Sequence, residues 1–326
     1  MDKLITAAVA ILSVPLALIA YILVVEWVVG KFKSKTADRL RPMLWVFPAV
    51  ALLFVFLVYP MISTGWFSLW NFDRAGVNFT TFAGIDNYVA FFTNVDTLTA
   101  LRNNLIWVIL LPTFAVGIGL IIAVLVDRVR YESVVKSVIF LPMAISFVAA
   151  TVIWKLVYDY NPNVGVLNAV VAGLGGDPIA WIQQQQPIPL NTIMLVIVGT
   201  WMLAGFAMVI LSAGLKAIPA ELLEAARVDG AGEWYVFRKI IFPLLLPTIA
   251  VVATTVIIFA LKTFDVVYTM TSGNFGTEVM ANRMYKELAT FHDPGRASAT
   301  AMILLVAIIP VMIFNIRRFR EQEALR

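Results

Sequence analysis

The chain has 326 residues, of which 61% are hydrophobic and only 13% are charged. Soluble domains carry about 25% charged residues, so this composition excludes a soluble globular protein, and the 22 Phe, 9 Trp and 9 Tyr exclude a disordered chain. The net charge is +4, and the absence of Cys excludes disulfides, thiolate metal sites and Cys nucleophiles. A polytopic membrane protein is the class that fits.

Seven apolar runs are long enough to cross a membrane, because a helix needs about 20 residues to span a hydrocarbon core of roughly 30 Å. In chain order the predicted spans are 4–25, 43–66, 105–126, 137–158, 190–212, 244–261 and 297–316. The first run is too long for the apolar region of a signal peptide, and no small-x-small cleavage site precedes the Lys cluster that follows it. We therefore expect a retained anchor helix.

The basic residues gather in alternate connecting segments. Segments 26–42, 127–136, 213–243 and 317–326 hold 16 of the 24 Lys and Arg residues, whereas 159–189 holds none. Lys and Arg are retained on the cytoplasmic side of a membrane. We expect a multi-pass protein of a bacterial or archaeal plasma membrane, with its amino terminus outside and its carboxyl terminus in the cytoplasm.

The segments expected outside differ in character. Residues 67–104 are rich in aromatic residues, Asn and Thr, which indicates an ordered interfacial helix and turn on the outer headgroups. Residues 159–189 combine Gly and Pro with a run of Gln, which is typical of irregular surface structure. Residues 262–296 carry four basic residues and give the weakest support to this orientation.

One cytoplasmic segment, 213–243, spends more than twenty residues on a helical hairpin in water. Pro219 suits the first position of a helix, and Gly230 suits the left-handed conformation that ends one. The helix between them has apolar residues at three- and four-residue spacing, which form a shallow face that fits a groove of another protein: Leu222, Ala225 and Ala226. After Gly230 a second helix should return to the membrane and break at Pro243 and again at Pro247.

The residues of this segment follow the order E-A-A, three residues, G, nine residues, I-x-L-P, with Phe242 in place of Leu. They are Glu224, Ala225, Ala226, Gly230, Ile240 and Pro243. The segment resembles the EAA signature of the permease subunits of ABC importers. The variant Asp229-Gly230-Ala231 with an aromatic residue after it resembles the carbohydrate subfamily, which includes the maltose and alpha-glucoside permeases.

The resemblance extends over about residues 40–320, since 41–70 is similar to the first core helix of that family and 140–168 to the third. It implies an all-α fold, a six-helix type I ABC importer permease core over 43–326. Residues 1–42 would then be an extra transmembrane helix with a basic cytoplasmic linker, which makes seven spans. The alternative for 213–243 is a cytoplasmic hairpin of an unrelated transporter.

The resemblance also implies the function: a permease subunit of an ATP-driven importer of a neutral carbohydrate, such as an oligosaccharide or an alpha-glucoside. The partners implied are a cytoplasmic ABC ATPase dimer seated on the EAA loop 213–243, a second and different permease, and an extracytoplasmic sugar-binding protein. Lipid surrounds the spans, and no nucleic acid is expected. Asp229 joins the signature residues as a coupling candidate.

Catalytic machinery is not expected in this chain. It has no G-x-x-x-x-G-K-[ST] phosphate loop, so ATP and Mg should bind only to the partner ATPase. No nucleotide fingerprint or Ser-His-Asp set is present, and the lone His292 excludes a His-ligated metal cluster and a multi-histidine proton relay. We interpret the chain as a transport subunit that is no enzyme by itself.

The spans hold almost no ionisable residues, which are costly inside a bilayer, so a neutral cargo is favoured over an ion. Family resemblance implies that the helices on either side of the coupling segment line the sugar path. The candidates for cargo binding are Thr200, Trp201, Phe206, Thr255, Phe259, Thr263 and Asp265. The alternative is that these residues only pack helix against helix.

Charged residues at the outer ends of spans have two interpretations, a gate or docking contact and the snorkelling of charged ends to the headgroups. These residues are Lys155, Asp159, Lys262 and Asp265. Two other functions are compatible with an apolar polytopic chain. An ion-coupled secondary transporter would show inverted repeats and intramembrane carboxylates, neither of which is evident. A membrane scaffold or receptor would move no solute.

Overall fold

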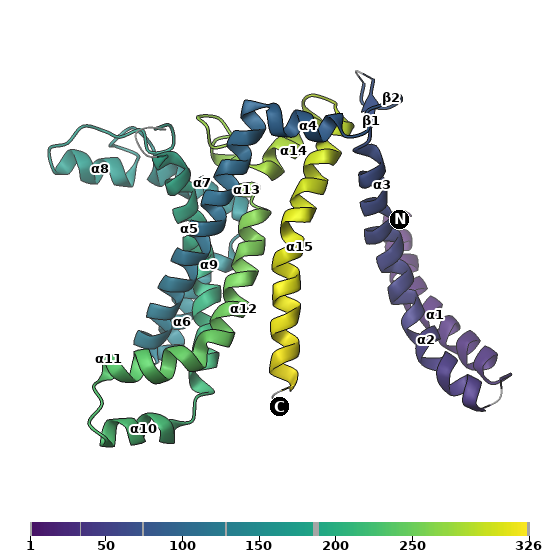
Figure 1. The fold of residues 1–326 in the computed structure, drawn as a ribbon, viewed down its shortest axis with the longest axis horizontal. Coiled ribbons are helices and arrows are strands. Elements are labelled where there is room, and N and C mark those ends of the chain that lie inside the picture. The colour runs from purple at the N-terminus through teal and green to yellow at the C-terminus, as the bar shows by residue number, and fades with distance from the viewer. Residues whose placement is uncertain (1, 33, 74, 128, 185–188, 325–326) are drawn as a thin grey trace. The chain divides into compact units, whose positions relative to one another are not determined.

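The structure is a computed structural model, and it describes residues 2–32, 34–73, 75–127, 129–184 and 189–324. The described chain is almost entirely helical. It divides into two compact units, Met1–Trp66 and Phe67–Arg326 (Figure 1).

Five helices in the described part are long and apolar enough to cross a membrane, and a bent pair makes a sixth if it is one span. The five are Lys35–Phe67, Val95–Val126, Leu190–Lys216, Glu233–Leu261 and Pro294–Arg317. Each contains one predicted span. The first predicted run, 4–25, lies in one continuous helix, α1 (Asp2–Val29), which contains Pro15.

The first unit is a helical hairpin that continues into a longer helix. It comprises α1, α2 (Ser34–Leu53), the π-helical turn η1 (Phe54–Val58) and α3 (Tyr59–Phe67). The hydroxyl of Tyr21 donates to the Leu44 carbonyl, and Arg41 pairs with Glu26 at 2.9 Å. These two contacts fix α1 along α2.

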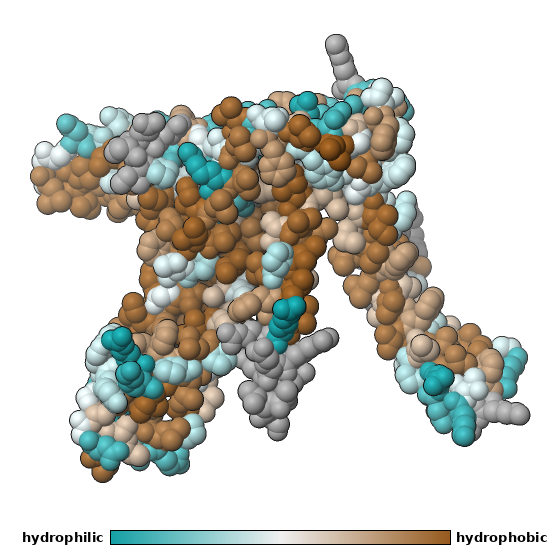
Figure 2. All heavy atoms as spheres, in the orientation of Figure 1, coloured by the Kyte–Doolittle hydropathy of each residue, from teal (hydrophilic) through white to brown (hydrophobic). Residues whose placement is uncertain are grey.

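The second unit is built on four long helices. They are α5 (Val95–Val126), α9 (Leu190–Lys216), α12 (Phe242–Leu261) and α15 (Pro294–Ala324). The core lies where α5, α9 and α12 pack together, around buried side chains such as Trp107, Leu195 and Val252. Apolar side chains cover the middle of this unit and polar ones gather at its two ends (Figure 2), as expected for helices in lipid.

The predicted span 137–158 is not one straight helix. α6 (Glu132–Phe140), the 3₁₀ turn η2 (Leu141–Ala144) and α7 (Phe147–Val157) follow one another, and the two arms meet at 99°. Pro142 removes a backbone donor at the turn, and the Ser146 hydroxyl accepts from the Ala149 amide at 3.1 Å and so starts a new helix. The predicted span is therefore present as a bent pair of helices.

The segment 67–104 is ordered, and it includes a strand pair where only helix and turn were expected. β1 (Trp70–Phe72) pairs antiparallel with β2 (Phe79–Phe82). Aromatic rings meet across the pair, with centroids 5.3 Å apart for Trp70 and Phe82. Cross-strand aromatic contacts stabilise such hairpins, which the interfacial interpretation overlooked. The helix α4 (Asp86–Thr93) follows.

The remaining connections contain short helices. α8 (Val166–Gly173) lies within 159–189, where irregular structure was expected. α13 (Asp265–Met270) and α14 (Met280–Ala289) lie between α12 and α15. At the opposite end of the unit, α10 (Ala220–Val228), α11 (Glu233–Val236) and the π-helical turn η3 (Phe237–Ile241) connect α9 to α12 (Figure 1). We call residues 213–243 the coupling loop.

Candidate coupling loop and transport cavity

The coupling loop is a helical hairpin with a small apolar interior. Leu223 and Ala226 of α10 face its second arm, where they join a cluster around Val236, Ile241 and Leu245. Those three residues are buried, with exposed fractions of 7% or less. The hairpin is thus held by side-chain packing at its root, close to α12.

The other side of α10 is exposed. Leu222 is 49% exposed and Val228 is 87% exposed, and Glu224 and Ala225 are exposed beside them. Leu222 and Ala225 therefore lie on the open face as predicted, whereas Ala226 packs inside the hairpin. No residue of α10 is buried, so this helix presents small and apolar side chains to its surroundings.

Gly230 ends α10 in the way that the sequence predicts. Its φ is +84°, in the left-handed region. The amide of Ala231 donates to the Ala226 carbonyl at 3.0 Å, and the amide of Gly230 donates to the Arg227 carbonyl at 3.0 Å. This pair of bonds is a Schellman motif, which satisfies carbonyls that the helix end leaves open. Asp229 is the exposed residue that caps the helix just before this turn.

The second arm does not break at Pro243 or Pro247, contrary to expectation. The Phe242 amide bonds to the Phe237 carbonyl across the π turn, and the helix then continues through both prolines. In an ordinary α-helix the ring of Pro243 would clash with the carbonyl of Lys239. The wider turn of η3 precedes Pro243, and a one-residue bulge of this kind occurs in α-helices at functional positions.

A cavity of about 310 Å³ lies between α5, α7, α9 and α12, away from the coupling loop. Its wall contains aromatic rings, hydroxyl groups and two charged residues, one just after α12 and one at the start of α13. These residues are Trp107, Phe147, Phe259, Phe264, Thr255, Thr263, Lys262 and Asp265. The arrangement can receive a ligand that has both apolar faces and hydroxyl groups.

Four of the seven predicted cargo residues line this cavity: Thr255, Phe259, Thr263 and Asp265. The other three, on α9, do not. Thr200 is buried, the Trp201 ring meets Trp154 edge to face at 5.8 Å, and Phe206 packs against the helix core. Gly199 and Leu203 represent α9 in the wall instead.

Sequence reasoning missed three aromatic residues of the cavity. Trp107 is almost fully buried, and its indole nitrogen has no acceptor among the described residues. Phe147 enters the wall because α7 starts after the bend, which the apolar run does not reveal. Phe264 stacks on Tyr268 with ring centroids 5.0 Å apart. A hydrogen bond with Tyr268 raises the pKa of Tyr285 above its ordinary value.

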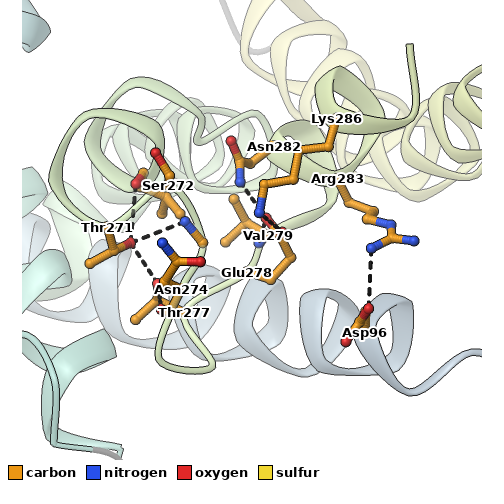
Figure 3. Close-up of polar contacts among 12 residues, drawn as sticks. Asp96, Thr271, Ser272, Asn274, Thr277, Glu278, Val279, Asn282, Arg283 and Lys286 are labelled. Carbon is orange, nitrogen blue, oxygen red and sulfur yellow. Dashed lines mark hydrogen bonds and ion pairs between the residues drawn. The ribbon is translucent and has the colours of Figure 1, made fainter. Parts of the chain in front are cut away.

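A polar network holds the segment between α13 and α14 (Figure 3). Asn282 and Lys286 both donate to the carboxylate of Glu278, with 2.6 Å from the Lys286 ammonium. Arg283 pairs with Glu287 at 2.6 Å and with Asp96 of α5 at 3.3 Å. The network therefore links the segment between α13 and α14, together with α14 itself, to the first turn of α5.

The remaining charged candidates lie near helix ends. Lys155 is exposed in the last turn of α7, and Asp159 accepts a hydrogen bond from the Asn161 amide at 2.8 Å. His292 is exposed and has a positive φ of 54°. Groups of three or more residues able to hold a metal ion do not occur in the part of the chain that was described.

The sequence matches the family profile of the binding-protein-dependent transport system inner membrane component over residues 115–319. The chain belongs to this family. It is a multi-pass membrane protein and the permease subunit of an ABC importer, whose ATPase is a separate chain. The ion-coupled and scaffold alternatives are therefore set aside.

Two relatives resemble the chain over most of its length. The alpha-glucoside transport system permease protein AglF of Rhizobium meliloti is 40% identical and covers 99% of each chain. The osmoprotective compounds uptake permease protein GgtC of Synechocystis sp. is 49% identical over 87% of this chain and 100% of its own length.

The fold also matches a solved transporter. A bacterial ABC transporter involved in the import of the acidic polysaccharide alginate contains a chain with a TM-score of 0.72 and 22% identity. The match covers 88% of this chain and 96% of that one. The architecture is therefore that of an ABC importer permease, as the resemblance implied.

Proposed function

We propose that this permease carries a neutral carbohydrate of the alpha-glucoside type and forms half of the translocation path. The observation that carries the proposal is the cavity wall, in which aromatic rings and hydroxyl groups stand together. The alpha-glucoside named for AglF, a relative that matches nearly the whole chain, supports the same class of cargo.

The chemistry of the wall suits a sugar ring. The faces of Phe259 and Trp107 can cover the C–H surface of a pyranose, and Thr255 and Thr263 offer hydroxyl groups. The Thr255 hydroxyl donates to the Val251 carbonyl at 2.9 Å, so its oxygen is left to accept from a cargo hydroxyl. The buried indole N–H of Trp107 gains an acceptor when cargo oxygen approaches it.

A second cargo class deserves the same test, because GgtC is the relative with 49% identity and is named for osmoprotective compounds. A small neutral osmoprotectant with several hydroxyl groups fits the cavity chemistry equally well. One Lys and one Asp in the wall, Lys262 and Asp265, balance each other in charge and favour a cargo without net charge.

We further propose that the coupling loop seats on a cytoplasmic ABC ATPase dimer. The open face of α10, with Glu224 and Ala225, supports this role, as does the Gly230 turn that sets the direction of the second arm. Ala226, Ile240 and Pro243 would act indirectly, by shaping the hairpin and its continuation into α12. Asp229 lies at the exposed tip, beside Gly230.

The proposed complex also contains a different second permease and an extracytoplasmic sugar-binding protein. The coupling loop and the carboxyl terminus would lie in the cytoplasm and the amino terminus outside. Three of the four basic residues of the predicted outer segment 262–296 have carboxylate partners, namely Arg283, Lys286 and Arg296. The orientation itself rests on the 16 Lys and Arg residues of the four predicted cytoplasmic segments.

We propose that residues 43–326 are the permease core and that 1–42 is an addition to it. GgtC in its full length matches 87% of this chain, which is compatible with an addition of that size. The contacts of Tyr21 with Leu44 and of Glu26 with Arg41 join the added helix to α2.

The test is ATP hydrolysis by the reconstituted complex of this permease, its partner permease, the ATPase and the binding protein in lipid vesicles. Alpha-glucosides, other neutral disaccharides, small polyol osmoprotectants and an acidic sugar are supplied in turn. Stimulation by an alpha-glucoside with none by the acidic sugar supports the proposal. Stimulation by polyols alone selects the second class, and stimulation by the acidic sugar alone refutes both.

A further inference from the structure

An ion-pair cluster lies where α6 and α9 meet, next to the coupling loop. One carboxylate oxygen of Glu132, in the first turn of α6, is 2.7 Å from the ammonium of Lys216. The same oxygen accepts from Lys136, one turn further along α6. The Lys136 ammonium also donates to the hydroxyl of Ser212, which is buried in α9. We call these four residues the Glu132 cluster.

The position of the Glu132 cluster allows it to transmit a displacement of α10 to α6. Lys216 is the last residue of α9, and α10 begins at Ala220. Any displacement of α10 toward or away from the membrane therefore reaches Lys216 over three intervening residues. Through Glu132, the same displacement pulls on the first turn of α6.

α6 is also held to α9 at its far end. A Cβ on Gly205 would lie 2.5 Å from the Ile139 carbonyl oxygen and 2.9 Å from the Cα of Phe140, so the two backbones touch there. α6 thus lies along α9 (Figure 1) and contacts it both at the Glu132 cluster and at Gly205. Two points of attachment make α6 follow α9 in rotation as well as in translation.

The far end of α6 leads directly to the cavity. η2 follows Phe140, and after the 99° bend α7 opens with Phe147, whose side chain lines the cavity. A displacement of α6 together with α9 would move the bend that follows Phe140, and with it Phe147. The chain of contacts runs from the coupling loop to the cargo wall along α6, in addition to the direct path along α9.

We propose that Glu132 is the positioning residue that makes α6 and the Phe147 wall move with the coupling loop. The inference rests on the proposed coupling role of α10. Removing the carboxylate leaves the ammonium groups of Lys136 and Lys216 close together without the carboxylate that they share, and Asp127 remains as a more distant negative charge near Lys216. The ion pairs that hold the two helix ends together are then lost, while the packing at Gly205 is untouched.

The experiment measures cargo transported per ATP hydrolysed by the assembled complex in lipid vesicles. In Glu132→Gln the ratio should fall about fivefold or more, the range of a coupling free energy between sites, with hydrolysis retained. Lys216→Met should lower the ratio too, and the double variant should be no worse than the stronger single variant, because one contact is removed in each case. Asp38→Asn is the charge-matched control, since Asp38 is exposed and has no ion pair in the described part of the chain.

A ratio in Glu132→Gln equal to that of Asp38→Asn overturns the inference. If Glu132→Gln does not assemble, Lys216→Met decides by the same ratio. Gly230→Val in the coupling loop distinguishes the coupling role of α10 from the role of Glu132. When Gly230→Val loses coupling and Glu132→Gln keeps it, the loop assignment stands and the role of Glu132 falls; when both keep it, the coupling role of α10 itself is wrong.

Discussion

The Gly230 turn offers the sharpest test of the coupling loop, because its requirement is conformational alone. A Cβ placed on Gly230 meets nothing within 4 Å, so Gly230→Ala introduces no clash. The φ of +84° remains unfavourable for Ala, at a cost of roughly 1–2 kcal/mol, part of which is offset by the reduced freedom of the unfolded chain. A net cost of about 1 kcal/mol makes the native turn about fivefold less favoured over other arrangements of the loop.

The same loop contains a matched control. Gly232 also has no atom within 4 Å of an added Cβ, but its φ is −69°, which Ala adopts freely. Gly232→Ala therefore adds the same methyl group two residues away at little cost. Gly230→Asn is a second comparison, because Asn tolerates the left-handed region better than Ala does.

The assay is again cargo transported per ATP, measured beside the abundance of the complex in the membrane. The ratio should fall in the order Gly232→Ala, Gly230→Asn, Gly230→Ala and Gly230→Val, and abundance should stay constant because no residue of α10 is buried. Equal ratios for Gly230→Val and Gly232→Ala would refute the reasoning that the left-handed turn positions α10 for the ATPase.

Three further predictions follow from the contacts. Phe259→Ala should raise the KM of transport about fivefold at unchanged abundance, because one stacking contact of about 1 kcal/mol with the cargo is lost. Phe114→Ala is the control and should leave the KM unchanged, since the ring of Phe114 is exposed to a similar degree but lies outside the cavity. Arg283→Met should lower the thermal stability of the purified complex, since Glu287 is left buried without its counter-ion at a cost of about 3 kcal/mol. The double variant Arg283→Met, Glu287→Leu should recover much of the lost stability. Equal melting temperatures for the single and double variants would contradict this explanation. Ser146→Ala should cost about 1 kcal/mol in the same measurement through the lost cap of α7, whereas Ser146→Asp should not.

The long spans could be predicted because a helix that crosses lipid needs an apolar run of about 20 residues, and such runs can be recognised in the sequence. The bend between α6 and α7 could not, since its residues are as apolar as those of a straight span. Pro142 signals a possible break, but the 99° angle depends on how α7 packs against α13, far away in the sequence. The same holds for Phe147, whose place in the cavity follows from the bend.

The coupling loop was more predictable than the cavity for a related reason. Its geometry is local: a proline, a glycine and a fixed spacing determine where α10 begins and ends. The cargo wall depends on which face of a helix turns inward, and α9 is apolar all round, so its sequence carries no periodic signal for one face. Trp201 and Phe206 were reasonable candidates by residue type, yet they lie on faces that pack against other elements.

The prolines of the second arm were wrongly expected to break the helix, and the correction bears on how the permease works. α11, η3 and α12 form one continuous helix, Glu233–Leu261, that starts in the coupling loop and ends at the cavity with Phe259. A flexible break at Pro243 would weaken the connection between these two sites, because a continuous helix transmits a displacement along its axis more directly than two separate helices do. The π turn gives Pro243 its space without such a break. The two helices that flank the coupling loop, α9 and α12, thus both reach the cavity wall as continuous helices, whereas the bent α6–α7 pair reaches that wall from α6, which contacts α9 at the Glu132 cluster.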